Sequence, residues 1–467
     1  MRPGERLALH FIDLDDQGAG VTAPPRIHVA GALPGERVAA TVAHVSSHTA
    51  EAWADLETIE SASPDRRSPA CPAFGACGGC VLQHLAYAAQ LDWKRNRIVR
   101  ALAAQATLAA SDLPRSGLVV SACVASPRPL GYRNKSKLVA GRVAARLVLG
   151  AYAPRSHEVV DLAGCRIAEP PLDEAASALR AIFDEAGVEP YDERTATGEL
   201  RYVVLRANAD GQVLAVWVVA QPLPGGEALA RAFCAARPEV LGVVEHQNRA
   251  PGNNIFSVAD AGGERLLAGT DFFEDRIDVG GRALRLRLSP SAFFQANREV
   301  AALAYAAIAQ GLAVRPGERL VDAYSGIGAI ALTLAREAGE VIGIESHAGA
   351  VADATASAAR NGIANARFIA GDAAQALAAI DRADVVVLNP PRKGCATAVL
   401  AEVVRLAPRA IAYLSCDPET LARDLGWFAA RGYPARTITP FDMLPHTPHV
   451  EALALLARTA NQTPQLV

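Results

Sequence analysis

The spacing of apolar and polar positions first separates residues 6–60 from the rest of the chain. Short apolar runs follow one another there, with turn-forming sequences between them. The runs expected to form strands are Arg6–Asp13, Arg26–Ala30, Arg37–Val45 and Ala52–Ile59. This pattern predicts a small all-β barrel over residues 1–60, either an oligonucleotide-binding (OB-like) fold or another small β-domain.

The pattern changes after residue 60. Residues 61–70 have the serine and proline content of a linker, and a helical pattern runs from Leu85 to about Ala110. Helix and strand patterns then alternate without a repeat, as in Leu172–Ala186, Arg201–Arg206 and Val213–Val219. We expect an α+β central domain over residues 61–290.

Regular alternation of helical segments with short apolar strands begins near residue 300 and indicates a doubly wound parallel sheet. The expected strands are Arg319–Ala323, Glu340–Ile344, Ala366–Ile369, Asp384–Leu388 and Ala410–Ser415. Ligands of such sheets bind at the carboxyl ends of the strands, so residues directly after each strand are the first candidates for a site. We expect a Rossmann-like α/β domain over residues 291–467.

Composition supports a globular protein. Of the 467 residues, 51% are hydrophobic and 20% are charged, which suits large buried cores. The sequence lacks an apolar run long enough to span a bilayer, and its first residues lack the apolar core of a signal peptide, so we expect a cytoplasmic protein. The formal net charge of -3 does not itself indicate a nucleic-acid partner, although a local basic patch can occur on an acidic protein.

A nucleotide-cofactor pocket is predicted where the first three parallel strands end. Gly326 and Gly328 follow the first strand and permit a tight turn with close ligand approach. Glu345 follows the second strand, where a carboxylate can accept hydrogen bonds from ribose hydroxyls. Asp372 follows the third strand, where it would meet an adenine amine or cap a helix. The third glycine of the dinucleotide fingerprint is missing, which favours S-adenosylmethionine over NAD or FAD.

Two further strand ends carry candidate chemistry. Asn389-Pro390-Pro391-Arg392 forms a stiff loop, in which Asn389 would face the cofactor and Arg392 would contact a phosphate or a base. Cys416 ends the fifth strand, where it is a candidate nucleophile rather than a buried small residue. Glu451 begins a late apolar strand, and partial desolvation there suits a general base better than a solvated surface role.

Clustered cysteines suggest a metal site. Cys71, Cys77 and Cys80 supply three ligands within ten residues, and no second close pair follows, as zinc sites commonly require. Three close cysteines and one distant cysteine fit a [4Fe–4S] cluster better, although zinc remains an alternative. Cys165 is the expected fourth ligand, and Cys123 is the second choice.

These residues together resemble the RNA 5-methyluridine (uracil-C5) methyltransferase family over nearly the whole chain. The segments that carry the resemblance are Ala32–Glu36, Cys71–His84, Ser291–Asn297, Asp322–Gly328, Ser415–Pro418 and Asp442–Glu451. The resemblance implies a multidomain fold with an RNA-binding TRAM barrel, an iron–sulfur motif completed by Cys165, and a class I methyltransferase domain. It also implies that Gln295 and Tyr324 contact S-adenosylmethionine.

The family resemblance implies methylation of uridine carbon 5 in structured RNA. Addition of the Cys416 thiolate to carbon 6 of uracil makes carbon 5 nucleophilic, and Glu451 then removes the hydrogen from carbon 5. The barrel and the cysteine motif resemble the members that act on 23S ribosomal RNA, with transfer RNA as the alternative substrate. No membrane or protein partner is implied.

Departures from the family leave other functions to consider. Asn389 stands where the family usually has aspartate, and Asp417 stands where asparagine is usual. A non-catalytic RNA-binding chaperone with a degenerate site is therefore one alternative, although Cys416 and Glu451 argue against it. A cytosine-C5 methyltransferase is the other, but its catalytic cysteine would lie in the Pro390-Pro391 loop, which has none before Cys395.

Overall fold

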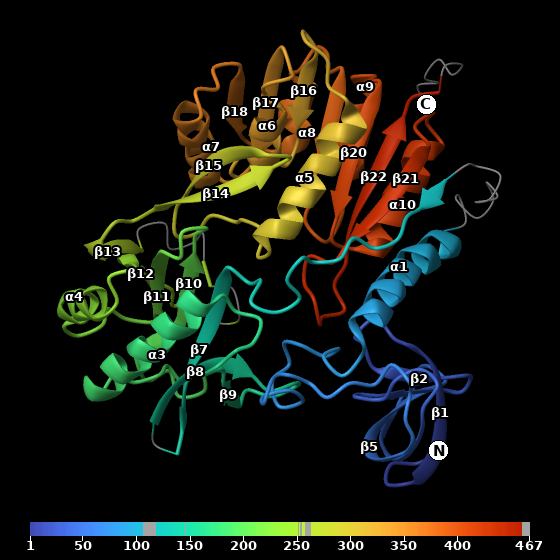
Figure 1. Ribbon diagram of the computed structural model, residues 1–467, viewed down its shortest axis with the longest axis vertical. Coiled ribbons are helices and arrows are strands. Elements are labelled where there is room, and N and C mark those ends of the chain that lie inside the picture. The colour runs from blue at the N-terminus through green and yellow to red at the C-terminus, as the bar shows by residue number, and fades with distance from the viewer. Residues whose placement is uncertain (106–117, 145, 251, 253–254, 257–262, 460–467) are drawn as a thin grey trace.

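The computed structural model describes residues 1–105, 118–144, 146–250, 252, 255–256 and 263–459 (Figure 1). These residues form a closed barrel, a seven-stranded sheet and an eight-stranded sheet, in chain order. In Figure 1 the barrel (blue) and the central unit (green) both lie below the carboxyl-terminal unit (orange and red). The expected multidomain fold with a small OB-like barrel and an α/β methyltransferase-type sheet is confirmed.

Five strands close the amino-terminal barrel in the order β1-β2-β3-β5-β4. Their bounds are β1 (Arg6–Leu14), β2 (Gly20–Thr22), β3 (Arg26–Val29), β4 (Arg37–Val45) and β5 (Glu51–Ser61). Alternate apolar side chains point inward, and Phe11, Val29 and Val38 are fully buried. The sequence pattern misses only β2, because its three residues are too few to show an alternation.

The central unit is a seven-stranded sheet with helices packed against it. The strand order is β13-β12-β11-β10-β7-β8-β9. The bounds are β7 (Lys135–Val143), β8 (Arg146–Tyr152), β9 (Val159–Asp161), β10 (Leu200–Ala207), β11 (Val213–Val219), β12 (Val240–Gln247) and β13 (Glu264–Gly269). Helices α3 (Pro170–Glu185) and α4 (Gly226–Ala236) share its core, where Trp217 meets the edge of Phe183 at 4.9 Å between ring centroids.

The carboxyl-terminal sheet has the order β18-β17-β16-β19-β20-β22-β21-β6. Its strands are β16 (Arg319–Asp322), β17 (Glu340–Glu345), β18 (Ala366–Ala370), β19 (Val385–Leu388), β20 (Ala410–Ser415), β21 (Ala435–Phe441), β22 (Glu451–Ala457) and β6 (Val119–Val120). The first five run parallel, as the sequence predicts, and β22 is antiparallel between β20 and β21. Because β6 comes from early in the chain, this sheet contains residues from both sides of the predicted domain boundary at residue 290. The division into domains at residues 1–60, 61–290 and 291–467 stays a prediction.

Helices pack against this sheet. They are α1 (Tyr87–Ala104), α5 (Arg298–Leu312), α6 (Ala329–Leu334), α7 (Ala348–Arg360), α8 (Ala373–Ala378), α9 (Thr397–Arg405) and α10 (Pro418–Ala429). The pattern that predicts a helix from Leu85 to Ala110 is confirmed up to residue 104, and residues 106–110 lie outside the described residues. No helix in the described part of the chain is both long and apolar enough to cross a membrane, and a cytoplasmic location stays a prediction.

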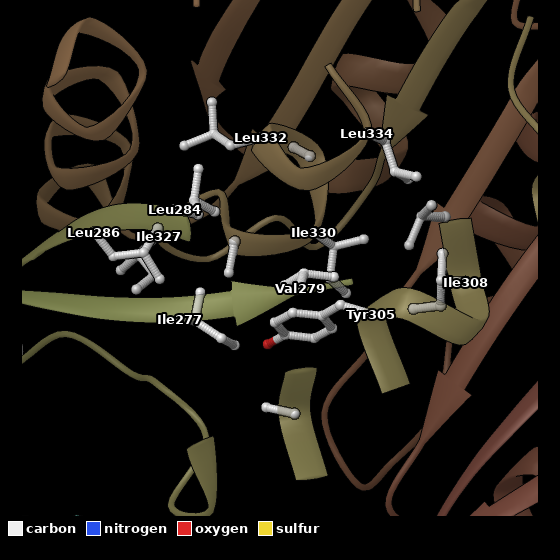
Figure 2. Close-up of a cluster of buried hydrophobic side chains, with 14 of the residues drawn as sticks. Ile277, Val279, Leu284, Leu286, Tyr305, Ile308, Ile327, Ile330, Leu332 and Leu334 are labelled. Carbon is white, nitrogen blue, oxygen red and sulfur yellow. The ribbon is translucent and has the colours of Figure 1, made fainter. Parts of the chain in front are cut away.

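A hairpin of β14 (Phe273–Val279) and β15 (Arg282–Leu288) packs its apolar face against α5 and α6 (Figure 2). Ile277 and Leu286 from the hairpin point toward Ile327, which lies in the turn after β16. Ile327 is only 2% exposed, so its side chain anchors the glycine turn in the core. The packing thereby fixes the position of the turn that is expected to meet a cofactor.

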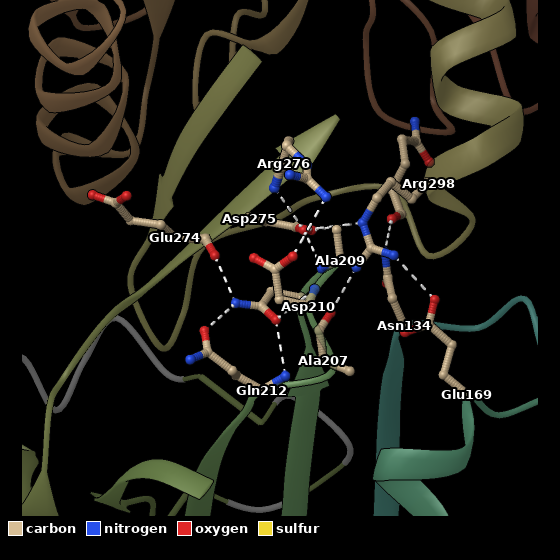
Figure 3. Close-up of polar contacts among 12 residues, drawn as sticks. Asn134, Glu169, Ala207, Ala209, Asp210, Gln212, Glu274, Asp275, Arg276 and Arg298 are labelled. Carbon is tan, nitrogen blue, oxygen red and sulfur yellow. Dashed lines mark hydrogen bonds and ion pairs between the residues drawn. The ribbon is translucent and has the colours of Figure 1, made fainter. Parts of the chain in front are cut away.

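A buried ionic network joins α5 to the central sheet (Figure 3). The Arg298 guanidinium contacts Asp275 at 3.0 Å and Glu169 at 3.1 Å, and it donates to the Ala207 carbonyl at 2.8 Å. These partners come from β14, from the residue before α3 and from β10, so three segments meet at one cation. A guanidinium suits this position because its fixed fork of donors can serve several acceptors at once.

Candidate active site

The glycine turn after β16 is open on one side and tightly packed on the other. Gly326 and Gly328 have φ angles of 53° and 81°, which side-chain-bearing residues rarely adopt. A Cβ at Gly328 would lie 2.9 Å from the ring of Phe368, whereas a Cβ at Gly326 would meet no atom within 4 Å. The open space over Gly326 lets a ligand approach the backbone closely.

Glu345 lies directly beside this turn. Its Oε2 accepts a hydrogen bond from the Gly326 N–H at 3.0 Å, and its Oε1 accepts from the His347 N–H at 2.8 Å and the Ser346 hydroxyl at 3.0 Å. A carboxylate offers about four lone-pair positions, so acceptor capacity remains for ribose hydroxyls. The structure thus brings together three of the residues expected at the cofactor pocket.

Asp372 and Tyr324 follow β18 and β16 at the same edge of the sheet. Asp372 Oδ1 caps α8, accepting from the N–H groups of Ala374 and Gln375 at 3.0 and 3.1 Å, and the residue is exposed. Tyr324 is half-buried and lies within electrostatic reach of both Asp372 and the Cys395 thiol. Burial raises the pKa of the Tyr324 hydroxyl, which therefore remains a hydrogen-bond donor near neutral pH.

Gln295 lies in the loop before α5. Asn134 Nδ2 donates to its backbone carbonyl at 3.1 Å, and the residue is 7% exposed. Asn297 in the same loop caps α5, where its side chain accepts from the Val300 N–H at 3.2 Å. The loop that carries Gln295 is therefore fixed at both the helix and the central sheet.

Cys416 and Glu451 are brought together by the antiparallel pairing of β20 with β22. Ser415 pairs with Ala452, so the next position outward sets Cys416 opposite Glu451. Both side chains are half-buried. Burial raises the pKa of the Cys416 thiol to about 11, with the Glu451 charge adding to the rise and Arg392 opposing it. Burial also raises the pKa of Glu451 to about 7.

The stiff loop after β19 supplies the cation that faces this pair. Arg392 is exposed, its guanidinium lies 3.4 Å from His449 Nε2, and its charge acts on both Cys416 and Glu451. Burial, followed by the charge of Arg392, lowers the pKa of His449 to about 4, so this histidine is neutral. Asn389 is half-buried at the tip of β19, between the strands that end at the glycine turn and at Cys416.

The four predicted cluster ligands line one pocket of about 230 Å³. Cys71, Cys77, Cys80 and Cys165 all contribute to its wall. Cys123 lies elsewhere, within electrostatic reach of Lys94 and Asp442. The described residues contain no group of three or more His, Cys, Asp or Glu side chains placed to hold a single metal ion. This geometry therefore does not distinguish the expected [4Fe–4S] cluster from the zinc alternative, and both stay predictions.

Three comparisons identify the chain's relatives. A family model described as tRNA (uracil-5-)-methyltransferase matches residues 242–459. RNA methyltransferases of Geobacter sulfurreducens and Listeria monocytogenes are 38% and 34% identical, each over 98% of this chain and over 91% and 98% of their own lengths. The chain belongs to this RNA methyltransferase family.

The fold of this methyltransferase also resembles a solved relative. The crystal structure of Pyrococcus abyssi tRNA (uracil-54, C5)-methyltransferase in complex with S-adenosyl-L-homocysteine superposes with a TM-score of 0.76 at 25% identity. The match covers 97% of this chain and 100% of the archaeal chain. The similarity therefore extends across all three sheet-containing units.

Several residues near the methyltransferase site are not assigned a role from the sequence, although Asp322 begins the segment Asp322–Gly328 that carries the family resemblance. Asp322 ends β16 fully buried, and burial raises its pKa to about 7. The charges of Asp322 and Glu451 both act on the buried hydroxyl of Tyr305 on α5. Lys94 on α1 is fully buried against the loop before Glu451. A helical lysine normally indicates a solvated face, so only the structure reveals it.

Proposed function

We propose that this methyltransferase transfers a methyl group from S-adenosylmethionine to carbon 5 of a uridine in RNA. The observation that carries the proposal is the pairing of a cysteine with a raised-pKa carboxylate at the carboxyl edge of the sheet. Cys416 and Glu451 face each other there, two strands away from the glycine turn along the same edge. Few other reactions need a nucleophilic sulfur, a base and an adenosine-type pocket in one place.

In the proposed mechanism the Cys416 thiolate adds to carbon 6 of the uracil ring, and the electron pair moves to give carbon 5 carbanion character. S-adenosylmethionine, when bound, would supply an electrophilic methyl group to carbon 5, with S-adenosylhomocysteine as the leaving group. The Glu451 carboxylate then removes the proton from carbon 5, the bond between sulfur and carbon 6 breaks, and the thiolate is restored. Arg392 favours the thiolate and the developing negative charge, since it opposes the rise in the pKa of Cys416.

We assign the cofactor pocket to residues from four strand ends and one loop. Glu345 would accept from the ribose hydroxyls, and the open face of Gly326 fits a closely approaching ligand. The complete proposed set is Gln295, Tyr324, Gly326, Gly328, Glu345, Asp372 and Asn389. Within it the Asp372 side chain also caps α8.

The proposed substrate is 23S ribosomal RNA, with transfer RNA as the alternative. The cysteine motif supports the ribosomal choice, because the chain resembles ribosomal-RNA enzymes in it. The barrel does not discriminate between the two substrates, since the similarity to the transfer-RNA enzyme covers 97% of this chain. The solved relative acts on transfer RNA, which supports the alternative. Mass mapping of 5-methyluridine in 23S and transfer RNA, each treated with the enzyme, distinguishes the two. Carbon 5 chemistry needs the base out of its stack, so we expect a flipped target in either RNA.

We also propose that Cys71, Cys77, Cys80 and Cys165 hold a [4Fe–4S] cluster. Their shared pocket supports the assignment, and a four-iron cluster spreads its thiolate ligands more widely than a single ion does. The cluster would have a structural role, since methyl transfer from a sulfonium needs no electron. The surrounding residues then only have to hold the four thiolates and exclude water.

The proposed function is tested with RNA that carries 5-fluorouridine. Fluorine at carbon 5 cannot leave as a proton, so the enzyme should remain bound through sulfur after methyl transfer. We expect a complex that survives denaturing electrophoresis with the wild-type protein and with Cys234→Ser, a control on α4, but not with Cys416→Ala. A wild-type enzyme that binds S-adenosylmethionine and RNA but forms no such complex would overturn the proposal.

A further inference from the structure

Helix α1 presents a stripe of polar side chains to the protein interior. Gln90, Lys94 and Arg97 recur at intervals of four and three residues, so they share one face of the helix. Gln90 and Lys94 are fully buried, and Arg97 is 9% exposed. All three contact the loop 442–450, which leads directly to Glu451.

The central contact of the stripe is an ion pair without access to water. Lys94 Nζ pairs with Asp442, and both side chains are completely buried. The same Nζ donates to the Leu444 carbonyl at 3.0 Å. Burying two charges is costly, and a buried pair seldom adds stability over apolar residues of similar size. We therefore expect the ion pair to have a role other than stability. Lys94 holds the start of the loop at two positions, Asp442 and Leu444.

The two flanking residues of the stripe fix the rest of the loop. Gln90 Oε1 accepts from the His446 N–H at 3.1 Å, while its Nε2 donates to the Leu82 and Leu85 carbonyls at 3.0 and 2.8 Å. Arg97 donates to the Pro448 carbonyl. His446 has a φ of 67°, an unfavourable conformation that these contacts help to maintain.

Other contacts hold the nucleophile. Cys416 lies between β20 and α10, where the Ser415 hydroxyl accepts from the Asp417 N–H at 3.2 Å and Asp417 caps the helix. The glycine turn is fixed by Ile327 and Glu345. Loosening the loop 442–450 would therefore displace the base while leaving the nucleophile and the cofactor turn in place.

We propose that Lys94 is a positioning residue for the proposed reaction, which holds the loop 442–450 so that Glu451 stays beside the carbon 5 proton. The inference rests on the proposed function. The proposal distinguishes two stages of that reaction. The first stage, addition of Cys416 and methyl transfer, does not use Glu451. The second stage, removal of the proton and breakage of the sulfur–carbon bond, does use Glu451, so the methylated covalent adduct should accumulate when Lys94 is lost.

The test measures adduct formation and adduct release separately, by rapid quench with unmodified uridine RNA. Lys94→Met should slow release by about tenfold or more, since small displacements of a reacting group have effects of this size. Formation should change less than release, because Lys94 reaches the group that favours the thiolate, Arg392, only indirectly, through His449 of the loop. Arg100→Met is the matched control: it removes a cation from the same helix, but Arg100 pairs with Asp13 in the barrel. The Glu451→Gln variant gives the rate of adduct release when the base is absent, for comparison.

A double variant separates positioning from folding. Lys94→Met leaves Asp442 as an unpaired buried charge, whereas Lys94→Met with Asp442→Asn removes both charges and should recover thermal stability. Slow release in the double variant supports the proposal, because the loop contacts are still missing. Rates are normalised to the fraction of enzyme that forms the 5-fluorouridine complex, so unfolded protein does not count.

Equal loss of formation and release in Lys94→Met, or full recovery of release in the double variant, would overturn the proposal. Failure of the wild type to form the 5-fluorouridine complex would instead reject the proposed function.

Discussion

The electrostatic relation between Cys416 and Glu451 sets the resting state of the site. Burial raises the pKa of the thiol to about 11 and of the carboxyl to about 7, and the charge of Glu451 further disfavours the thiolate. Near neutral pH the thiol is protonated and the carboxyl is divided between its two forms. Substrate binding must therefore help to form the thiolate, and Arg392 is the cation in place to do so.

The release step should depend on pH through Glu451. The base acts only as a carboxylate, so release should rise about tenfold per pH unit below 7 and level off above about pH 8. Adduct formation needs the thiolate, whose pKa is higher, so it should keep rising where release is already constant. Single-turnover rates of the two steps between pH 5.5 and 8.5 check this. Release that is independent of pH, or that falls as pH rises, would contradict the role of Glu451.

The two glycines of the cofactor turn should respond differently to alanine. Gly328→Ala adds a Cβ 2.9 Å from Phe368 at a φ of 81°, so it should lower the free energy of unfolding by about 2 kcal/mol or more. Gly326→Ala meets no neighbour and should cost only about 1 kcal/mol, but its methyl group projects where a ligand would lie. Urea unfolding and calorimetric titration with S-adenosylhomocysteine measure the two effects. Unchanged binding by Gly326→Ala would place the cofactor elsewhere.

At the scale of elements, the sequence predicts the strands better than their order. Expected strands such as Arg319–Ala323 and Ala410–Ser415 match β16 and β20 to within one residue, because each is an apolar run bounded by turn signals. The same local signal says nothing of where β22 pairs. Its insertion between β20 and β21 is what brings Glu451 to Cys416, and that pairing depends on contacts distant in sequence.

Helix α1 shows that the sequence also fails to predict which side chains of a helix are buried. Its periodicity predicts a helix, but Gln90, Lys94 and Arg97 would normally be assigned to the solvent-exposed face. They are buried because the loop 442–450 supplies the partners that they need, more than 340 residues later in the chain. Candidate cofactor residues such as Gly326 and Glu345 can be proposed from the sequence because strand ends mark the ligand edge. Gln295 follows only from the family resemblance, and positioning residues carry no marker of either kind.

At the scale of the whole molecule, the cysteine segment, residues 71–85, connects the barrel to the loop 442–450. Leu82 and Leu85, which follow Cys80, pack with Leu14 and Leu33 of the barrel and with Trp93 of α1. The Leu82 N–H donates to the His446 carbonyl at 3.0 Å, inside the loop 442–450. The position of the cysteine segment therefore bears both on the barrel and on the loop that presents Glu451.

Loss of a cluster ligand should consequently affect more than the local fold. Cys77→Ser removes one of the four proposed thiolate ligands, so we expect the protein to lose iron and its melting temperature to fall by several degrees. Weaker RNA binding should follow, because Leu82 and Leu85 no longer hold the barrel in place. Iron analysis, thermal melting and RNA titration measure the three effects, with Cys234→Ser as the control. A Cys77→Ser protein that lacks iron, yet melts and binds RNA like the wild type, would contradict a structural cluster. If Cys77→Ser keeps its fold but releases the methylated adduct slowly, the cysteine segment affects the reaction mainly through the hydrogen bond from the Leu82 N–H to the His446 carbonyl.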